Sequence, residues 1–240
     1  MAHDLDKKTW ELQGEEKADA VQEMFAEITP VYDRMNGIMS LSLHHRWRKN
    51  AVQKLELKKG QTAIDICCGT GAFLRPLLDS VGVEGKLIGV DFCEPILEKC
   101  KDSYGQHVEL RLADACDLPY ENETFDGATM GWGIRNVKDI SLALSEVYRV
   151  LKPNSRFVCL EMAQPENSIV RLCTHVLFHR VIPVIWKLLG NEKAGQYLSI
   201  STNNFISRVE LKKSMELVGF KQVQWKDLFF GNITMHWGTK

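Results

Sequence analysis

The chain has 240 residues, of which 45% are hydrophobic and 25% are charged, and its formal net charge is −1. This composition is typical of a globular protein with one domain or at most two, and it gives no reason to expect nucleic-acid binding. No apolar stretch approaches the ~18 residues of a transmembrane helix, and the chain's start lacks the apolar segment of a signal peptide. The seven cysteines include no CxxC pair. We therefore expect reduced thiols, no metal site and a cytoplasmic location, with or without peripheral contact to a membrane.

Residues 1–50 are predicted to form a helical cap. Apolar residues recur at helical spacing from Ala18, Thr29-Pro30 interrupts the pattern, and Asn36-Gly37 is a predicted turn. A polar and aromatic stretch follows at 44–48, with the sequence His-His-Arg-Trp-Arg. Surface or capping roles explain its histidines most simply, although a mere lid does not need so many polar and aromatic groups.

The predicted core begins with a strand at 62–67, a glycine turn and a helix at 72–81. The strand carries Asp65, and the turn is Gly69-Thr70-Gly71. Glycine lets the backbone approach a ligand closely, and open α/β sheets bind ligands at the carboxyl ends of their strands. A dinucleotide site would need a third glycine, which is missing here. Together with the anionic Asp65, this favours the cationic S-adenosylmethionine (SAM) over a pyrophosphate ligand.

Two further predicted strands end in acidic residues. The strand at 86–91 ends in Asp91, and the strand at 108–112 leads into Asp114. An acid in the position of Asp91 reaches ribose hydroxyls in nucleotide-binding α/β proteins, and Asp114 is well placed for an adenine amino group. Three successive strands that each end in an acid or a glycine turn predict a SAM site.

The alternation of strands and helices continues to residue 161. We expect a helix at 94–103, a strand at 125–130, a helix at 140–150 that ends at 151–154, and a strand at 156–161. The predicted fold class is therefore α/β, with a Rossmann-like, mostly parallel sheet of seven strands and helices on both faces.

A helical insertion or lid is expected at 162–207, followed by a helix at 209–218 and an antiparallel hairpin of strands 222–228 and 233–237. We interpret the chain as a single domain. Its predicted parts are the cap at 1–50, a SAM-binding core at 60–161, the lid, and a C-terminal helix and hairpin at 208–240.

Several stretches resemble class I SAM-dependent methyltransferases, specifically the C-methyltransferases of ubiquinone and menaquinone biosynthesis. They are residues 28–36 (Ile-Thr-Pro-Val-Tyr-Asp-Arg-Met-Asn), 44–48, 65–71, 133–137 (Gly-Ile-Arg-Asn-Val), 151–153 and 235–240. The resemblance runs from about residue 20 to the end of the chain. The Cys-Cys-Gly-Thr version of the glycine motif is most similar to the demethylmenaquinone branch.

The resemblance implies methyl transfer from SAM to a ring carbon of a prenylated quinol such as demethylmenaquinol. The expected cofactor-binding residues are Asp65, Gly69, Thr70, Gly71, Asp91, Phe92, Asp114, Ala115 and Gly131. The chain departs from the family at Gly131, where the family has a serine, at Asn154-Ser155 in place of two glycines, and at Ile206 in place of a proline.

Methyl transfer to carbon needs a nucleophilic ring carbon, which a hydroquinone supplies once a ring hydroxyl has lost its proton. We expect Arg135 to stabilise the phenolate and Asn136 to orient the hydroxyl. The alternative is that Arg135 is a structural ion-pair partner of Asp126 or Glu161. Candidates for the catalytic base are Tyr32, His175, His179 and Tyr197.

Apolar residues within 169–189 are candidates to hold a prenyl tail, which implies transient contact with a membrane surface. Other functions stay open at this point. They are methylation of another aromatic or polyketide-like molecule, SAM binding without catalysis, and NAD(P)-dependent oxidoreduction, which the missing third glycine disfavours. The sequence also allows a homodimer.

Overall fold

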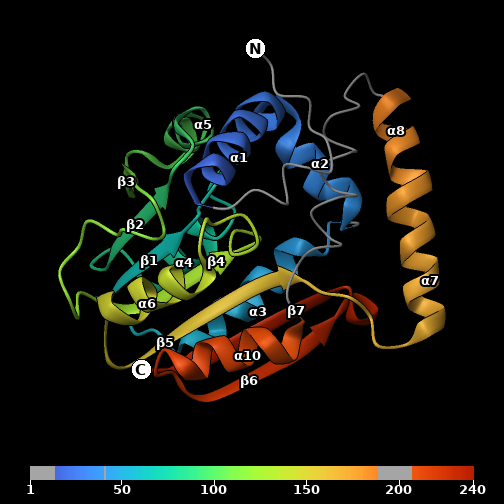
Figure 1. Cartoon of the computed structure of the whole chain (residues 1–240). Coiled ribbons are helices and arrows are strands. Elements are labelled where there is room, and N and C mark those ends of the chain that lie inside the picture. The colour runs from blue at the N-terminus through green and yellow to red at the C-terminus, as the bar shows by residue number, and fades with distance from the viewer. Residues whose placement is uncertain (1–13, 41, 189–206) are drawn as a thin grey trace.

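The computed structural model describes residues 14–40, 42–188 and 207–240 (Figure 1). The predictions for residues 1–13, Tyr197 and Ile206 lie outside these described residues. The division of the chain into one domain with four parts stays a prediction.

The centre of the fold is a seven-stranded sheet in the order β3-β2-β1-β4-β5-β7-β6 (Figure 1). Its strands are β1 (Thr62–Ile66), β2 (Lys86–Asp91), β3 (Glu109–Leu112), β4 (Phe125–Gly131), β5 (Leu151–Met162), β6 (Lys221–Leu228) and β7 (Ile233–Thr239). The first five strands are parallel, and β7 is antiparallel to both β5 and β6. This confirms the predicted α/β fold, with its mostly parallel sheet and antiparallel C-terminal hairpin.

Helices cover both faces of the sheet, because the central strands are apolar on both sides. One face packs against α3 (His44–Leu55), α4 (Leu74–Val81) and α5 (Glu94–Tyr104). The other face packs against α6 (Ile140–Val150) and α10 (Arg208–Leu217). Ile64 and Ile66 on β1 are fully buried between these layers.

A third cluster of buried residues joins the N-terminal helix to the segment that follows β5. It contains Phe25 and Ile28 of α1 (Gly14–Ile28), Ile96 of α5, and Ile182 and Trp186 of α8 (Ile182–Leu188). The 3₁₀ turn η2 (Thr29–Val31) and α2 (Tyr32–Met39) continue from α1, and α7 (Ser168–Val176) and the π-helical η3 (Leu177–Val181) lead into α8. Within the described ranges, no helix is long and apolar enough to cross a membrane.

Three local predictions were wrong. Asn36-Gly37 does not form a turn but lies inside α2, where the Ser40 amide donates to the Asn36 carbonyl at 3.1 Å. Helix α6 ends at Val150 as predicted, with Leu151 as its C-cap, but β5 begins at Leu151 rather than at residue 156, and Leu151 pairs with Phe125 of β4. Helix α4 begins at Leu74 rather than at residue 72, since Gly71 has a φ of +89°, which is incompatible with a helix.

Candidate functional site

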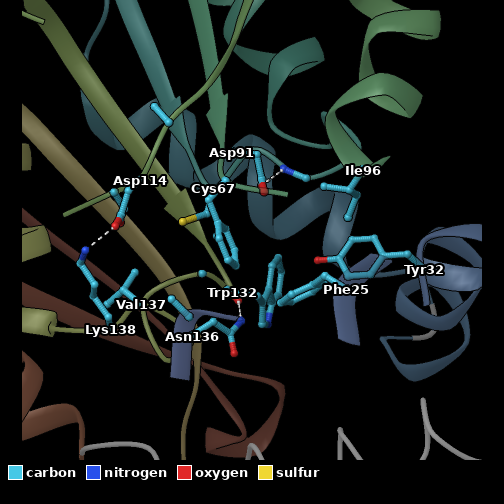
Figure 2. Close-up of a pocket in the computed structure, with 17 residues that line it drawn as sticks. Phe25, Tyr32, Cys67, Asp91, Ile96, Asp114, Trp132, Asn136, Val137 and Lys138 are labelled. Atoms are coloured by element: carbon cyan, nitrogen blue, oxygen red, sulfur yellow. Dashed lines mark hydrogen bonds and ion pairs between the residues drawn. The ribbon is translucent and has the colours of Figure 1, made fainter. Parts of the chain in front are cut away.

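A pocket of about 630 Å³ opens at the carboxyl ends of β1, β2, β3 and β4 (Figure 2). We call it the cofactor pocket. It is lined by Ala18, Phe25, Tyr32, Cys67, Gly69, Asp91, Phe92, Ile96, Ala113, Asp114, Ala115, Gly131, Trp132, Gly133, Asn136, Val137 and Lys138.

Asp91, the last residue of β2, organises the glycine turn. One of its oxygens accepts from the Gly69 amide at 2.8 Å, and the other accepts from the Cys93 amide at 3.0 Å. A carboxylate oxygen has two lone pairs, so each oxygen of Asp91 can still accept one ribose hydroxyl. Burial raises the pKa of Asp91 to about 6, while the backbone donors favour the charged form.

Asp114 follows the end of β3, the strand next to β2, and lines the same cofactor pocket. It accepts from the Cys116 amide at 2.8 Å through one oxygen and pairs with Lys138 at 2.9 Å through the other. Figure 2 shows Asp114 and Lys138 on one side, Phe25 and Tyr32 on the other, and Trp132 between them. Asp91 and Asp114 thus offer hydrogen-bond acceptors at two separated points, as an adenosine group requires.

Two residues at the ends of the central strands have a left-handed backbone. Cys67 follows β1 and Trp132 follows β4, and both have a φ of 56°. Such a conformation is unfavourable for a residue with a Cβ and is concentrated at functional sites. Burial and the neighbouring Asp91 and Asp65 raise the pKa of the Cys67 thiol, so it stays protonated and forms a neutral part of the wall.

Gly131 makes room for an aromatic ring. A Cβ at this position would lie 2.4 Å from Cε2 of Phe73. A serine, which the resemblance leads one to expect at this position, therefore does not fit beside Phe73 as this ring lies in the structure. Gly131 lines the cofactor pocket with backbone atoms alone.

The helical cap is tied to the loops around the cofactor pocket by three polar contacts. Lys17 donates to the Val137 carbonyl at 2.8 Å, Gln22 donates to the Phe92 carbonyl at 3.0 Å, and Glu15 pairs with Lys138 at 2.7 Å. Because these contacts come from α1, this helix encloses the cofactor pocket together with Tyr32 of α2, whose ring lies 3.7 Å from the Cβ position of Gly69.

A second hollow of about 510 Å³ shares the Trp132 side chain with the cofactor pocket. We call it the acceptor pocket. It is lined by Asn36, Ser40, His44, Trp47, Arg48, Trp132, Arg135, Met162, Phe229, Asn232 and Ile233. Three aromatic rings and two arginines among these residues suit a flat ring that carries oxygen atoms.

Arg135 and Asn136 face different pockets. Asn136 lines the cofactor pocket, and its side-chain amide donates to the Trp132 carbonyl at 3.1 Å. Arg135 lines the acceptor pocket and forms a buried ion pair with Glu161 at the end of β5. Of the two partners considered from sequence, Glu161 is therefore the observed one, since Asp126 pairs with Lys152 instead.

The structure gathers most, but not all, of the predicted site residues. The cofactor pocket contains Tyr32, Gly69, Asp91, Phe92, Asp114, Ala115, Gly131 and Asn136. Asp65, Thr70 and Gly71 do not line it. Asp65 is buried and accepts from Thr129 at 2.7 Å, Thr70 donates to Asp33 of α2, and Gly71 lies against Tyr104 and Cys100. Contact of these three residues with the cofactor stays a prediction.

Sequence reasoning missed several lining residues. Trp132 and Lys138 flank the Gly-Ile-Arg-Asn stretch, and this adjacency was a usable signal. Phe25 carried no comparable signal, since it belongs to an ordinary apolar helix face. His44 is buried in the acceptor pocket, which excludes a surface role. The base candidates His175 and His179 line neither pocket.

The sequence was compared with protein families and with known proteins, and both comparisons find methyltransferases. The model of the ubiE/COQ5 methyltransferase family matches residues 12–240. The chain is 37% identical over 226 residues to a demethylmenaquinone methyltransferase of Lactiplantibacillus plantarum, with 92% of this chain and 95% of that protein covered. It is 39% identical over 225 residues to the protein of that name from Staphylococcus aureus, with 92% and 93% covered.

Among solved structures, a SAM-dependent methyltransferase from Aquifex aeolicus superimposes with a TM-score of 0.60 at 17% identity, over 80% of this chain and 88% of that one. The sheet order and this likeness show the fold of a class I SAM-dependent methyltransferase. Within that class, the chain belongs to the ubiE/COQ5 methyltransferase family.

Proposed function

We propose that this methyltransferase transfers the methyl group of SAM to a ring carbon of a prenylated quinol such as demethylmenaquinol. The observation that carries the proposal is the acceptor pocket, which adjoins the cofactor pocket at Trp132 and combines aromatic rings with cationic side chains. The names of the relatives at 37% and 39% identity support the same acceptor.

When bound, SAM supplies an electrophilic methyl group on a sulfonium. The chain must align the acceptor ring with this group, accept a proton from the ring hydroxyl and exclude water. We assign Asn136 to holding the Trp132 backbone where the two pockets meet, because its side-chain amide donates to the Trp132 carbonyl. We assign Arg135, which lines the acceptor pocket, to stabilising the phenolate. The ion pair with Glu161 offsets part of the charge of Arg135. Tyr32 lies over Gly69 at the cofactor end and is assigned to closing the reaction space there.

The segment α7 to α8 is proposed to contact the prenyl tail and the membrane surface. Figure 1 shows it as a helical rod at the edge of the molecule. Ile182 and Trp186 of this segment are buried, but other large apolar side chains are exposed, with Ile169 at 72% and Leu172 at 64%. Arg171 and Arg180 lie among the exposed residues. An apolar helix face with basic residues is typical of segments that lie at a membrane interface.

The tail assignment is tested with Leu172→Glu. We expect a higher KM for a long-tailed quinol presented in vesicles and an unchanged KM for a short-tailed quinol. Leu217→Glu on α10 is the matched control, since Leu217 is 87% exposed on a different element. Equal KM changes for both quinols, or equal changes in both variants, would contradict this assignment.

The acceptor is tested by an anaerobic assay with [13C-methyl]SAM and a short-tailed demethylmenaquinol. The product is analysed by mass spectrometry and NMR. A labelled methyl group on the ring carbon supports the proposal, whereas a methyl group on oxygen, or no transfer while SAM still binds, overturns it.

A second candidate is methylation of another aromatic or polyketide-like molecule. The observation that favours it is Gly131 in the cofactor pocket, where Phe73 takes the space of the serine side chain that the resemblance leads one to expect. A panel of phenols in the same assay separates the two candidates. A higher kcat/KM for a non-quinone phenol than for the quinol would favour the second one.

A further inference from the structure

Two polar side chains of the acceptor pocket are buried without partners. Arg48 of α3 is only 5% exposed, and its Nε and Nη1 atoms have no hydrogen-bond partner among the described residues. Asn232 donates through its side-chain nitrogen to the Phe229 carbonyl at 3.0 Å, but its side-chain oxygen has no partner there. A buried polar atom without a hydrogen-bond partner lowers the stability of the fold. Each of these atoms therefore indicates a ligand atom that would hydrogen-bond to it.

Arg48 has aromatic rings beside it and, among the described residues, no protein carboxylate paired with it, so its charge is available to a negatively charged oxygen of a ligand. In the part of the chain that the structure describes, Arg48 makes no ion pair. Its guanidinium carbon lies 4.5 Å from the centroid of the Trp132 ring and 5.6 Å from that of Phe73. These cation–π contacts hold the charge next to the wall that the two pockets share. The donors on Nε and Nη1 remain for an oxygen of the acceptor ring.

The hydrogen bonds of His44 assign its tautomer. Oγ of Ser40 lies 2.6 Å from the Asn36 carbonyl oxygen and 2.6 Å from Nδ1 of His44. A carbonyl oxygen only accepts, so the single Ser40 hydroxyl proton is directed to Asn36. His44 therefore donates its Nδ1 proton to Ser40, and its Nε2 atom carries a lone pair.

His44 also stays neutral at physiological pH, so its Nε2 lone pair carries no proton, but its lowered pKa makes it a weak base that needs an acidified acceptor hydroxyl. Burial, and then the positive charge of Arg48, lower the pKa of His44 to about 4. The charged or titratable groups that face it are Arg48 and His45 on its own helix, Asp33 on α2, and Arg135 in the same pocket. The hydroxyl proton is easier to remove because Arg48 stabilises the negative oxygen that remains.

We propose that His44 is the proton acceptor of the reaction and that Arg48 binds the oxyanion formed on the acceptor ring. This inference rests on the proposed function, since it requires a phenol-type acceptor. The ring hydroxyl gives its proton to Nε2 of His44, and the resulting phenolate oxygen accepts hydrogen bonds from Arg48. The Asn232 oxygen accepts from the second ring hydroxyl of a quinol.

In the methyl transfer, one bond forms for each bond that breaks. The bond between the ring carbon and the methyl carbon forms while the bond between the methyl carbon and sulfur breaks, which leaves a thioether. The ring carbon releases its hydrogen as a proton, and the oxygen regains a proton from His44. The net result is a methylated ring and one proton released to solvent.

The base is tested with His44→Gln, and His45→Gln is the matched control because His45 is the exposed neighbour on the same helix. We expect kcat of His44→Gln to fall by about 10²- to 10⁴-fold at pH 7 with little change in KM. This loss should shrink as pH rises, because an acceptor that is already ionised no longer needs a base. A loss that is constant from pH 6 to 10, or smaller than threefold, would overturn the role of His44.

The oxyanion site is tested without turnover. A nitronaphthol, whose absorbance reports its ionisation, is titrated in the presence of the wild type saturated with S-adenosylhomocysteine. We expect the pKa of the bound phenol to fall by at least one unit relative to the free phenol. Arg48→Met should abolish this shift, Arg48→Lys should restore part of it, and Arg46→Met, which changes an exposed arginine of the same helix, should preserve it.

Unchanged binding of S-adenosylhomocysteine by each variant confirms that it is folded. No shift in the wild type, or an equal shift in Arg48→Met, would overturn the role of Arg48. These outcomes are distinguishable from failure of the proposed function. If the wild type methylates a quinol but the variants behave like it, only this inference fails, whereas absence of any quinol methylation sinks the proposed function itself.

Discussion

The two adjoining pockets differ in whether their buried polar atoms have hydrogen-bond partners within the protein. In the cofactor pocket, Asp91 is held by two backbone amides, and Asp114 is held by one amide and Lys138. In the acceptor pocket, Arg48 and Asn232 are buried with atoms that have no partner among the described residues. The cofactor pocket is therefore preorganised by the protein, whereas the acceptor pocket keeps buried polar atoms that a ligand is proposed to complete.

This difference has a physical basis. A cofactor common to a whole class can be met by acids fixed at strand ends, where backbone donors keep them charged. A methyl acceptor must instead change its charge during the reaction, so the groups that meet it are worth most when they are left free for the reacting atoms. Trp132, which lines both pockets, connects these two kinds of site.

The largest expected effect comes from breaking the ion pair of Arg135 and Glu161, which supports the acceptor pocket. Arg135→Ala leaves the fully buried Glu161 without this partner, and we expect the free energy of unfolding to fall by about 3–5 kcal/mol. Chemical denaturation measures this change.

The double variant Arg135→Met/Glu161→Met separates stability from catalysis. It should recover most of the lost stability, because no unpaired charge remains. If Arg135 also acts on the acceptor, kcat stays low in this variant. A double variant with wild-type kcat would show that the pair is structural only.

The second prediction concerns the cofactor pocket. Asp91→Ala removes the acceptor for the Gly69 and Cys93 amides and for the ribose, so we expect the Kd for SAM to rise about 100-fold, by analogy with hydrogen bonds to charged groups. Asp102→Ala, an exposed change on α5, is the control. Calorimetry that gives equal Kd values for the two variants would rule out Asp91 as a cofactor ligand.

The third prediction is a smaller effect at the shared wall. Gly131→Ser forces the Phe73 ring to move, and we expect the Kd for SAM to rise about tenfold, which corresponds to the cost of overpacking. Gly131→Ser/Phe73→Ala should return the Kd toward the wild-type value. Failure of this rescue would mean that Phe73 is not the group that excludes the serine.

The smallest predicted effect concerns Asp65, which lies inside the sheet. Burial raises its pKa to about 7 from an ordinary value of 3.8, so the folded protein binds this proton more tightly than the unfolded chain does. The contribution of Asp65 to the stability of the wild type therefore falls as pH rises from about 4 to 7, whereas the amide side chain of the Asp65→Asn variant does not titrate.

We expect the melting temperature of Asp65→Asn, relative to the wild type, to be higher at pH 8 than at pH 5. Thermal unfolding of both proteins at the two pH values measures this difference. A difference that does not depend on pH would show that Asp65 does not titrate in this range.

Sequence predicted the fold and most of the cofactor pocket because both depend on local patterns. Strands that end in Asp91 and Asp114 can be identified without knowing how the chain packs. Asp65 looked similar but lies one residue before the end of β1, in register with Thr129 of β4, so its side chain faces that neighbour. Thr70 is directed to Asp33, which comes from the helical cap. Neither partner follows from local sequence.

The acceptor pocket was less predictable, because its walls come from α2, α3, the loop after β4 and the segment between β6 and β7. The ion pair of Arg135 and Glu161 joins residues that are 26 positions apart. The stretch at 44–48 was noticed for its unusual composition, but only packing shows that His44 and Arg48 are buried while His45 and Arg46 are exposed.

The central claim is that cofactor and acceptor occupy two separate pockets that meet at Trp132. It is tested most directly by calorimetric binding of short-tailed demethylmenaquinone to the protein saturated with S-adenosylhomocysteine. We predict that the quinone binds with a stoichiometry of one, that saturation with S-adenosylhomocysteine does not weaken this binding, and that Trp47→Ala in the acceptor pocket weakens the quinone alone. Mutually exclusive binding of the two ligands would contradict the claim.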